Sequence, residues 1–155
     1  MAINKTLLYE KIKQELMRQK HAVTFDLSLV LYLIDKTIFN DPRHNCVMKG
    51  GKKDWEGLPA TKSLFHAKTD CGLPIGNLTS QLFGNVFMNS FDHWVKKYLG
   101  IKYYGRYVDD FILVHHSREY LIDSIVRIKG YLKDNLALDL HPDKIYLQHY
   151  TRGVK

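Results

Sequence analysis

The sequence predicts an α+β fold in which a small antiparallel sheet packs against helices on one of its faces. Apolar residues recur at helical spacing in four segments. These segments span residues 5–19, 24–39, 78–97 and 118–133. Two short runs rich in β-branched and aromatic residues, 101–108 and 111–115, flank Asp109-Asp110 as the strands of a hairpin would. Two further runs, 136–140 and 145–147, are predicted to form strands that join this sheet.

The composition fits one basic globular domain. The 155 residues include 23 Lys and Arg against 16 Asp and Glu, a formal charge of +7, which suits a polyanionic partner. The two cysteines, Cys46 and Cys71, show no CxxC spacing, so a four-cysteine zinc site is excluded and a reducing compartment is expected. No apolar run approaches the ~20 residues of a membrane span, and the N-terminus carries no signal-peptide pattern. We expect a soluble cytoplasmic protein without a membrane partner.

The N-terminal half is predicted to begin with two helices. Asn4 is expected to cap the first helix, and Ile3 and Leu8 fit a hydrophobic staple around that cap. Thr24 is expected to cap the second helix, which Asn40-Asp41-Pro42 ends. This second helix is more apolar than a surface helix needs, so we expect it to be buried around much of its circumference.

A long irregular segment follows, and a glycine- and proline-rich turn then leads into the third helix. Residues 41–71 break the helical periodicity, and loops of this length are usually functional or mobile. The helix from Leu78 to Lys97 carries aromatic residues at helical spacing that we assign to the core. They are Phe83, Phe87, Phe91 and Trp94. Asp92 on the same helix is read as solvated or locally ion-paired.

The pair Asp109-Asp110 is the most informative feature. Adjacent carboxylates repel each other, so such a pair between two apolar strands is unfavourable without a cation nearby. Hard cations such as Mg²⁺ prefer carboxylate oxygens. The alternative is a solvent-exposed hairpin turn without a ligand, which is common.

The turn before the third helix is a second candidate site. Gly76 lets the backbone approach a ligand closely, and Asn77, Ser80 and Gln81 offer donors and acceptors beside a helix N-terminus, which favours anions. The alternative is an ordinary turn that leads into a well-capped helix.

Three segments taken together resemble the reverse transcriptases of bacterial retroelements. They are Gly72–Gln81, Tyr107–Asp110 and Leu140–Lys144, which resemble motif B, the catalytic motif C and motif D. Residues 58–65 are similar to the lead-in to motif B. Ile75-Gly76 and Ser80-Gln81 replace the commoner Gln-Gly and Ser-Pro, and this form resembles the diversity-generating branch, which is associated with error-prone copying of RNA, notably at adenines.

The resemblance implies an RNA-directed DNA polymerase palm that uses two Mg²⁺ ions, an RNA template, a DNA primer and dNTPs. Asp109 would be the principal metal ligand, Asp110 its partner that helps shape the site, and Lys144 would assist the departing pyrophosphate. The remaining site residues would contact the primer end, template or nucleotide. They are Tyr107, Ile75, Gly76, Asn77, Ser80 and Gln81.

The same resemblance implies a single palm subdomain over residues 1–155, truncated at both ends. Residues 1–4 resemble the tail of motif A, whose aspartate would lie about six residues before Met1, and residues 152–155 resemble the start of motif E. The fingers and thumb would then be absent, and the isolated chain is expected to be inactive. The alternatives are a catalytically dead palm that binds nucleic acid, and a nucleotide cyclase, which the template-contacting segment disfavours. An accessory protein is a further candidate partner.

Overall fold

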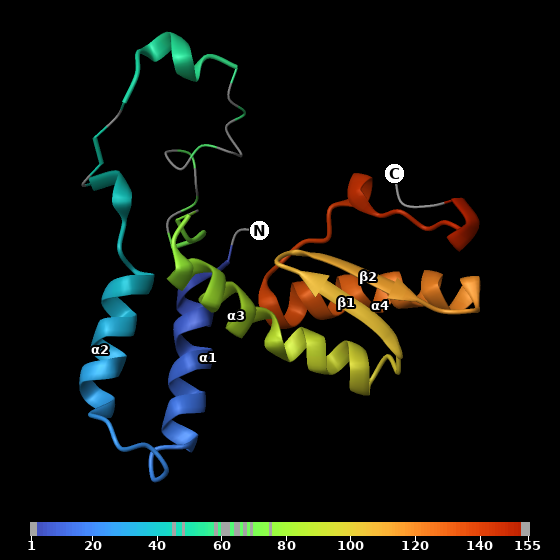
Figure 1. Ribbon diagram of the computed structural model, residues 1–155, viewed down its shortest axis with the longest axis horizontal. Helices are drawn as coiled ribbons and strands as arrows, with labels where there is room; N and C mark the ends of the chain where they lie inside the picture. Colours follow the sequence, from blue (N-terminus) through green and yellow to red (C-terminus); the bar gives the residue numbers. More distant parts are fainter. Residues whose placement is uncertain are drawn as a thin grey trace. The chain divides into compact units, whose positions relative to one another are not determined.

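The chain combines four α-helices with one two-stranded antiparallel sheet in the residues that its computed structural model describes. These are residues 3–44, 46–47, 49–57, 59, 63, 66, 68, 70–74 and 76–152. The α+β prediction is therefore confirmed. The chain divides into two compact units, Met1–Phe87 and Met88–Lys155, and helix α3 (Leu78–Lys97) continues across the boundary between them. Figure 1 shows the elements in order.

The first unit is built on the antiparallel pair α1 (Lys5–Arg18) and α2 (Leu27–Ile38), which lie side by side (Figure 1). The cap predicted for α1 is confirmed, because Asn4 Oδ1 accepts the amide N–H of Leu7 at 2.8 Å. Ile3 and Leu8 are both buried, as a hydrophobic staple requires. The edge of Tyr9 meets Phe39, which joins the two helices at the end where α2 finishes.

Two predictions for α2 are wrong. The cap is Asp26 rather than Thr24, since the Asp26 carboxylate accepts the amides of Ser28 and Leu29 at 2.9 and 3.1 Å. The helix is also not buried around its circumference. Three of its large apolar residues are more than half exposed, and Ile38 at its last turn is fully buried. The exposed three are Leu29, Tyr32 and Leu33.

The described part of the segment 41–71 contains two short 3₁₀ turns, Pro42–His44 and Lys52–Trp55. At the end of this segment the chain returns to the residues at the start of α1. The amide of Lys5 donates to the Asp70 carbonyl and the amide of Gly72 donates to the Ile3 carbonyl, each at 2.8 Å. These two hydrogen bonds fix the start of the turn that precedes α3. Most of residues 58–65, the expected lead-in to motif B, lies outside the described residues.

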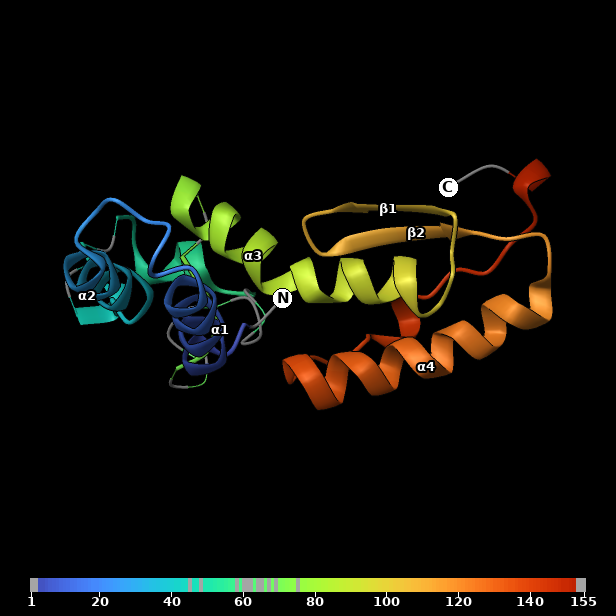
Figure 2. The ribbon, with the colours of Figure 1, turned by 90° about the horizontal axis from the view of Figure 1, so that it is seen from below.

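The second unit packs a hairpin and a helix on the C-terminal half of α3. The hairpin consists of β1 (Tyr103–Tyr107) and β2 (Asp110–Val114), and α4 (Arg118–Leu136) follows. Figure 2 shows the hairpin on one side of α3 and α4 on the other. Phe91 of α3 makes both contacts: its ring centroid lies 5.2 Å from that of Phe111 on β2 and 5.8 Å from that of Tyr131 on α4.

The aromatic residues assigned to the core lie there. Phe83, Phe87 and Phe91 are buried, and Trp94 stacks on Tyr131 at 4.4 Å between ring centroids. The assignment of these rings to packing is therefore confirmed.

The strands predicted at 136–140 and 145–147 are wrong. Helix α4 begins after Ser117, whose hydroxyl oxygen accepts the Tyr120 amide at 3.1 Å, and it extends to Leu136, beyond the predicted end at residue 133. Ile128, Leu132 and Leu136 form a buried helical stripe, and this stripe outweighs the alternation of leucines that imitated a strand. Ala137 then ends the helix in a left-handed conformation. The tail after it, 138–152, contains the 3₁₀ turns Pro142–Lys144 and Tyr150–Arg152.

None of the helices in the described part of the chain combines the length and the apolar composition that a membrane crossing requires.

Candidate functional site

The two adjacent aspartates lie at the tip of the hairpin. Tyr107 pairs with Asp110, so Val108 and Asp109 form a two-residue loop between β1 and β2. Asp109 is thus a turn residue, whereas Asp110 is the first residue of a strand, and both are exposed. The predicted hairpin is confirmed, with each strand boundary moved by one or two residues.

The backbone of this turn is strained. Val108 has a φ of +56°, and Asp109 is not among the residues with positive φ. Positive φ at the first central residue alone is the pattern of a type II′ turn, where glycine is the usual occupant. A β-branched residue there is a genuine outlier, and such strain of about 1–3 kcal/mol concentrates at functional sites. The turn thus has the backbone character expected of a functional loop.

The hairpin has an exposed outer face and a packed inner face. Directly paired residues share a face, so Tyr107 and Asp110 lie on the same side as the pair Gly105 and Ile112. Tyr107 is 83% exposed and Ile112 is 53% exposed. The outer face therefore offers one carboxylate and an aromatic ring to solvent, beside the carboxylate of the turn.

A polar cluster on the inner face connects the hairpin to α3. The Asp92 carboxylate accepts Arg106 Nε at 2.8 Å and Nη2 at 2.7 Å, and it also accepts the Tyr104 hydroxyl at 2.6 Å. Burial alone would raise the pKa of Asp92, but the hydrogen bonds from Arg106 and Tyr104 outweigh it and hold that pKa below its ordinary value. Burial and the hydrogen bond to Asp92 raise the pKa of Tyr104.

Arg106 also reaches the turn, because its Nη1 donates to the Val108 carbonyl at 2.6 Å. The sequence reading of Asp92 as solvated or locally paired missed this link, since the partner lies 14 residues away on another element. Strand alternation could have indicated it: Arg106 follows Tyr104 by two positions and so faces α3 with it.

The one other predicted site residue of the second unit, Lys144, lies far from the turn in the sequence. Lys144 ends the 3₁₀ turn Pro142–Lys144 with its side chain exposed, and its amide donates to the His141 carbonyl at 3.1 Å. The structure thus brings Tyr107, Asp109 and Asp110 together in one turn, while Lys144 belongs to the tail.

The residues of the segment that resembles motif B lie in the first unit. Gly76 has a φ of +96°, which favours glycine, and the Asn77 carbonyl accepts the amides of Ser80 and Gln81 at 3.1 and 3.4 Å as α3 begins. Asn77 and Ser80 line a hollow of about 260 Å³ that Lys36 of α2 also borders. Ile75 lies outside the described residues.

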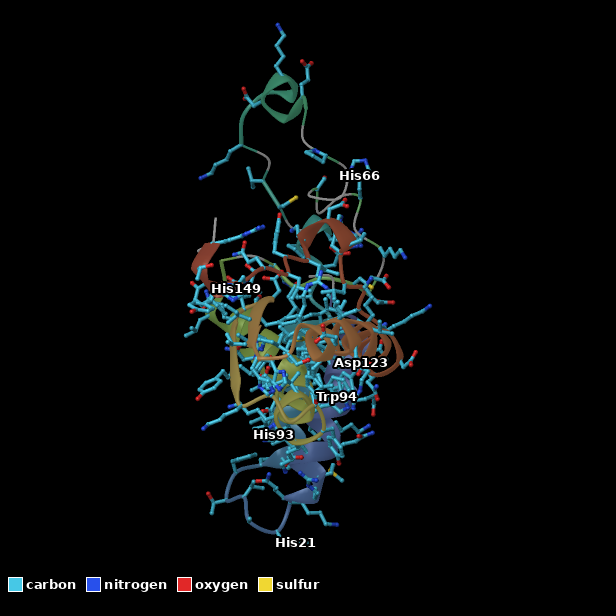
Figure 3. The ribbon with its side chains drawn as sticks, turned by 90° about the vertical axis from the view of Figure 1, so that its right-hand side faces the viewer. His21, His66, His93, Trp94, Asp123 and His149 are labelled. Carbon is cyan, nitrogen blue, oxygen red and sulfur yellow. The ribbon has the colours of Figure 1, made fainter. Side chains whose placement is uncertain are left out.

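The described residues contain no group of three or more His, Cys, Asp or Glu side chains that could hold a metal ion. In Figure 3 the labelled histidines do not gather within either unit: His21 lies apart from His66, and His93 lies apart from His149. The carboxylates of Asp109 and Asp110 are nevertheless hard oxygen donors on adjacent residues, and they fit a Mg²⁺ ion that takes its remaining ligands from water or phosphate.

No protein-family model, curated protein or solved structure matches this chain. The function is therefore inferred from the turn, its neighbours and the motifs of the sequence.

Proposed function

We propose that the chain is the palm core of an RNA-directed DNA polymerase of the bacterial retroelement kind, most similar to the diversity-generating branch. The complete enzyme would join deoxynucleotides to the 3′-hydroxyl of a DNA primer on an RNA template. The observation that supports this best is the pair of exposed carboxylates at a strained two-residue turn, Asp109 and Asp110, beside the exposed ring of Tyr107.

Asp109 and Asp110 are the residues that would hold Mg²⁺, and two such ions would supply charge stabilisation for the phosphates and activation of the attacking hydroxyl. The protein's own contribution is to present both carboxylates at a tip that solvent and substrate can reach. A tight two-residue loop restricts where Asp109 can point. Asp110 is held in place as the first residue of β2. Positioning of this kind accounts for most catalysis of phosphoryl transfer.

The neighbouring residues have roles that follow from their chemistry. The exposed ring of Tyr107 lies on the face that carries Asp110, where it can pack against the sugar or base at the primer end. Exposed Lys144 is a mobile cation suited to the charge that develops on the departing pyrophosphate.

The start of α3 in the first unit suits the template or nucleotide. Gly76 leaves the backbone open, because a Cβ added there would meet no atom of the described residues within 4 Å. Asn77 and Ser80 line the hollow next to the positive end of the α3 dipole, which favours a phosphate group. Gln81 follows on the first turn of the helix and offers a carboxamide to a base.

The second candidate is a palm that binds nucleic acid without catalysis. It is favoured by one observation: no third carboxylate joins Asp109 and Asp110 in the described part of the chain. A hard cation needs several oxygen ligands, so two ions sharing two carboxylates would be under-ligated. We therefore expect the 155 residues alone to lack polymerase activity, and a complete polymerase to supply a further carboxylate.

Primer extension tests the proposal. The isolated chain, and a longer polypeptide that includes the residues encoded upstream of Met1, are incubated with an RNA template, a DNA primer, labelled dNTPs and Mg²⁺. We expect template-complementary incorporation by the longer polypeptide alone, provided an Asp lies about six residues before Met1.

Asp109→Asn in the longer polypeptide is the control, since it removes one carboxylate at nearly constant volume. It should abolish incorporation while the far-UV circular dichroism spectrum is unchanged. Incorporation that survives this substitution would move the metal site elsewhere. Nucleic-acid binding without incorporation, in a polypeptide that carries the upstream Asp, would favour the non-catalytic palm.

A further inference from the structure

The Arg106 side chain connects the buried side of the hairpin to the backbone of the carboxylate turn. Two of its nitrogens, Nε and Nη2, grip the Asp92 carboxylate of α3, and the third, Nη1, donates to the Val108 carbonyl at 2.6 Å. The side chain is only 9% exposed, although it lies on a two-stranded hairpin. A charged side chain is buried in this way only where its partners are fixed. The fold itself therefore holds the link from Asp92 through Arg106 to the Val108 carbonyl.

We propose that Arg106, held by Asp92, is a positioning residue that fixes the orientation of the Val108–Asp109 peptide and thereby aims the Asp109 carboxylate. The proposal deepens the proposed function, on which its catalytic meaning rests. The positioning itself is a property of the hairpin and can be measured without any activity.

The physical reason is that a two-residue hairpin turn has alternative forms. Type I′ and type II′ turns differ in the orientation of the peptide between the two central residues, and in type I′ the second central residue also takes a positive φ. Both forms put the β-branched Val108 at positive φ, so its strain does not select between them, and Asp109 tolerates the positive φ that type I′ would require. Local preference alone thus does not favour this form. The Arg106 hydrogen bond to the Val108 carbonyl stabilises it, because a flipped peptide would turn that carbonyl away.

The geometry requires arginine. A guanidinium presents several N–H donors in a rigid planar fork, so it can grip both oxygens of Asp92 and reach the Val108 carbonyl at once. A lysine at this position keeps the charge and can pair with Asp92, but its single nitrogen cannot make all three contacts. Arg106→Lys therefore separates the link to the turn from the ion pair.

Nuclear magnetic resonance relaxation dispersion on the ¹⁵N-labelled chain tests the proposal. Peptide flips exchange on the microsecond to millisecond timescale that this method detects. We expect flat dispersion profiles for the Val108 and Asp109 amides in the wild type. In Arg106→Lys the alternative turn should rise about tenfold in population, which is the effect of losing one hydrogen bond to a charged group. Asp92→Asn should produce the same exchange, since it releases the guanidinium, and it serves if Arg106→Lys fails to fold.

Tyr104→Phe is the matched control. It removes the hydroxyl that donates to the Asp92 carboxylate and that also interacts with the Arg106 guanidinium, but it leaves Arg106 Nη1 in place to donate to the Val108 carbonyl. If both Arg106→Lys and Asp92→Asn leave the turn amides without exchange, or if Tyr104→Phe produces equal exchange, the proposal is overturned, because the cluster then only supports the fold.

A second measurement separates this inference from the proposed function. Addition of Mn²⁺, a paramagnetic substitute for Mg²⁺, should broaden the Asp109 and Asp110 amides, and Arg106→Lys should need several-fold more Mn²⁺ for the same broadening. Equal midpoints in wild type and variant would contradict the aiming of Asp109. Absence of broadening in the wild type would count against the metal site of the proposed function, while the dispersion profiles would still decide the role of Arg106.

Discussion

Val108 has a backbone conformation that its β-branched side chain disfavours. Its φ of +56° places a β-branched residue in the left-handed region, and the residue is half exposed, so packing does not demand a valine there. Asp109, which bears the proposed chemistry, follows it directly. Strain next to a candidate site is a pattern typical of functional loops.

Val108→Gly should therefore stabilise the chain. Relief of backbone strain outweighs the entropy that glycine adds to the unfolded state, and we expect a gain of about 1 kcal/mol in the free energy of unfolding. Val114→Gly is the matched control, because Val114 is equally exposed but has ordinary strand backbone. It should lower stability by about 1 kcal/mol. Urea unfolding followed by circular dichroism gives both values, and a loss of stability in Val108→Gly would show that the turn is unstrained.

Asp92 predicts a dependence of stability on acid. Its pKa is held below the ordinary value near 3.8, so its ionised form stabilises the folded state at higher pH, and this contribution is lost as the pH falls through the lowered pKa. Between about pH 5 and pH 2 the wild type should lose more stability than Asp92→Asn, which has no carboxyl group to protonate. Urea unfolding at a series of pH values measures the difference. Parallel curves for the two proteins would remove Asp92 as the cause.

At the scale of elements, two glycines test the assigned backbone conformations. Gly130 lies in α4, and Gly100 lies in the turn after α3. Among the residues that the structure describes, no atom would lie within 4 Å of a Cβ added at Gly130 or at Gly100, where φ is +61°. The two sites therefore differ in backbone conformation and not in space.

Gly130→Ala should raise the free energy of unfolding by about 1 kcal/mol, the difference in helix propensity. Gly100→Ala should lower it by about 1 kcal/mol, because alanine is strained at positive φ. Thermal and urea unfolding of the two variants checks both signs. Equal effects of the two substitutions would contradict the assigned conformations.

The four α-helices and the hairpin could be predicted from the sequence because each has a strong local signal. Asn4 and Ser117 are typical helix caps, and the apolar runs around Asp109-Asp110 indicate two strands. The strands predicted at 136–140 and 145–147 failed because leucines two apart at 136, 138 and 140 imitate strand alternation. The buried position of Leu136 at the end of the α4 stripe is a tertiary effect that the local pattern does not contain.

In the candidate site, too, some features follow from the local sequence and others depend on tertiary packing. The tip position of Asp109 and Asp110 follows from local pattern, whereas the pairing of Asp92 with Arg106 depends on how β1 packs against α3. Burial of α2 was overestimated because composition does not say which elements cover a helix. The strain at Val108 was also invisible, since nothing in its sequence neighbourhood demands positive φ.

At the scale of the whole molecule, the charge of +7 predicts salt-sensitive binding to RNA or DNA. Each phosphate contact contributes a slope of about −0.7 to −0.9 to log K against log salt, so a few contacts give a slope near −2 to −3. Fluorescence anisotropy with a labelled oligonucleotide measures it. Lys144→Gln should make the slope shallower by about one contact, while Lys20→Gln, an exposed lysine beyond the end of α1, should leave it unchanged. A slope close to zero in the wild type would exclude phosphate contacts as the basis of binding.

The central proposal is that the Asp109–Asp110 turn binds a divalent cation. Mn²⁺ added in small steps to the ¹⁵N-labelled protein tests it most directly, because paramagnetic broadening marks the amides nearest the bound ion. The Asp109 and Asp110 amides should broaden first, and Asp109→Asn should remove the effect. Two other pairs of candidate ligands, Asp41 with His44 and His141 with Asp143, serve as internal comparisons. Earlier broadening at either of those pairs, or broadening of the turn that persists in Asp109→Asn, would contradict the proposal.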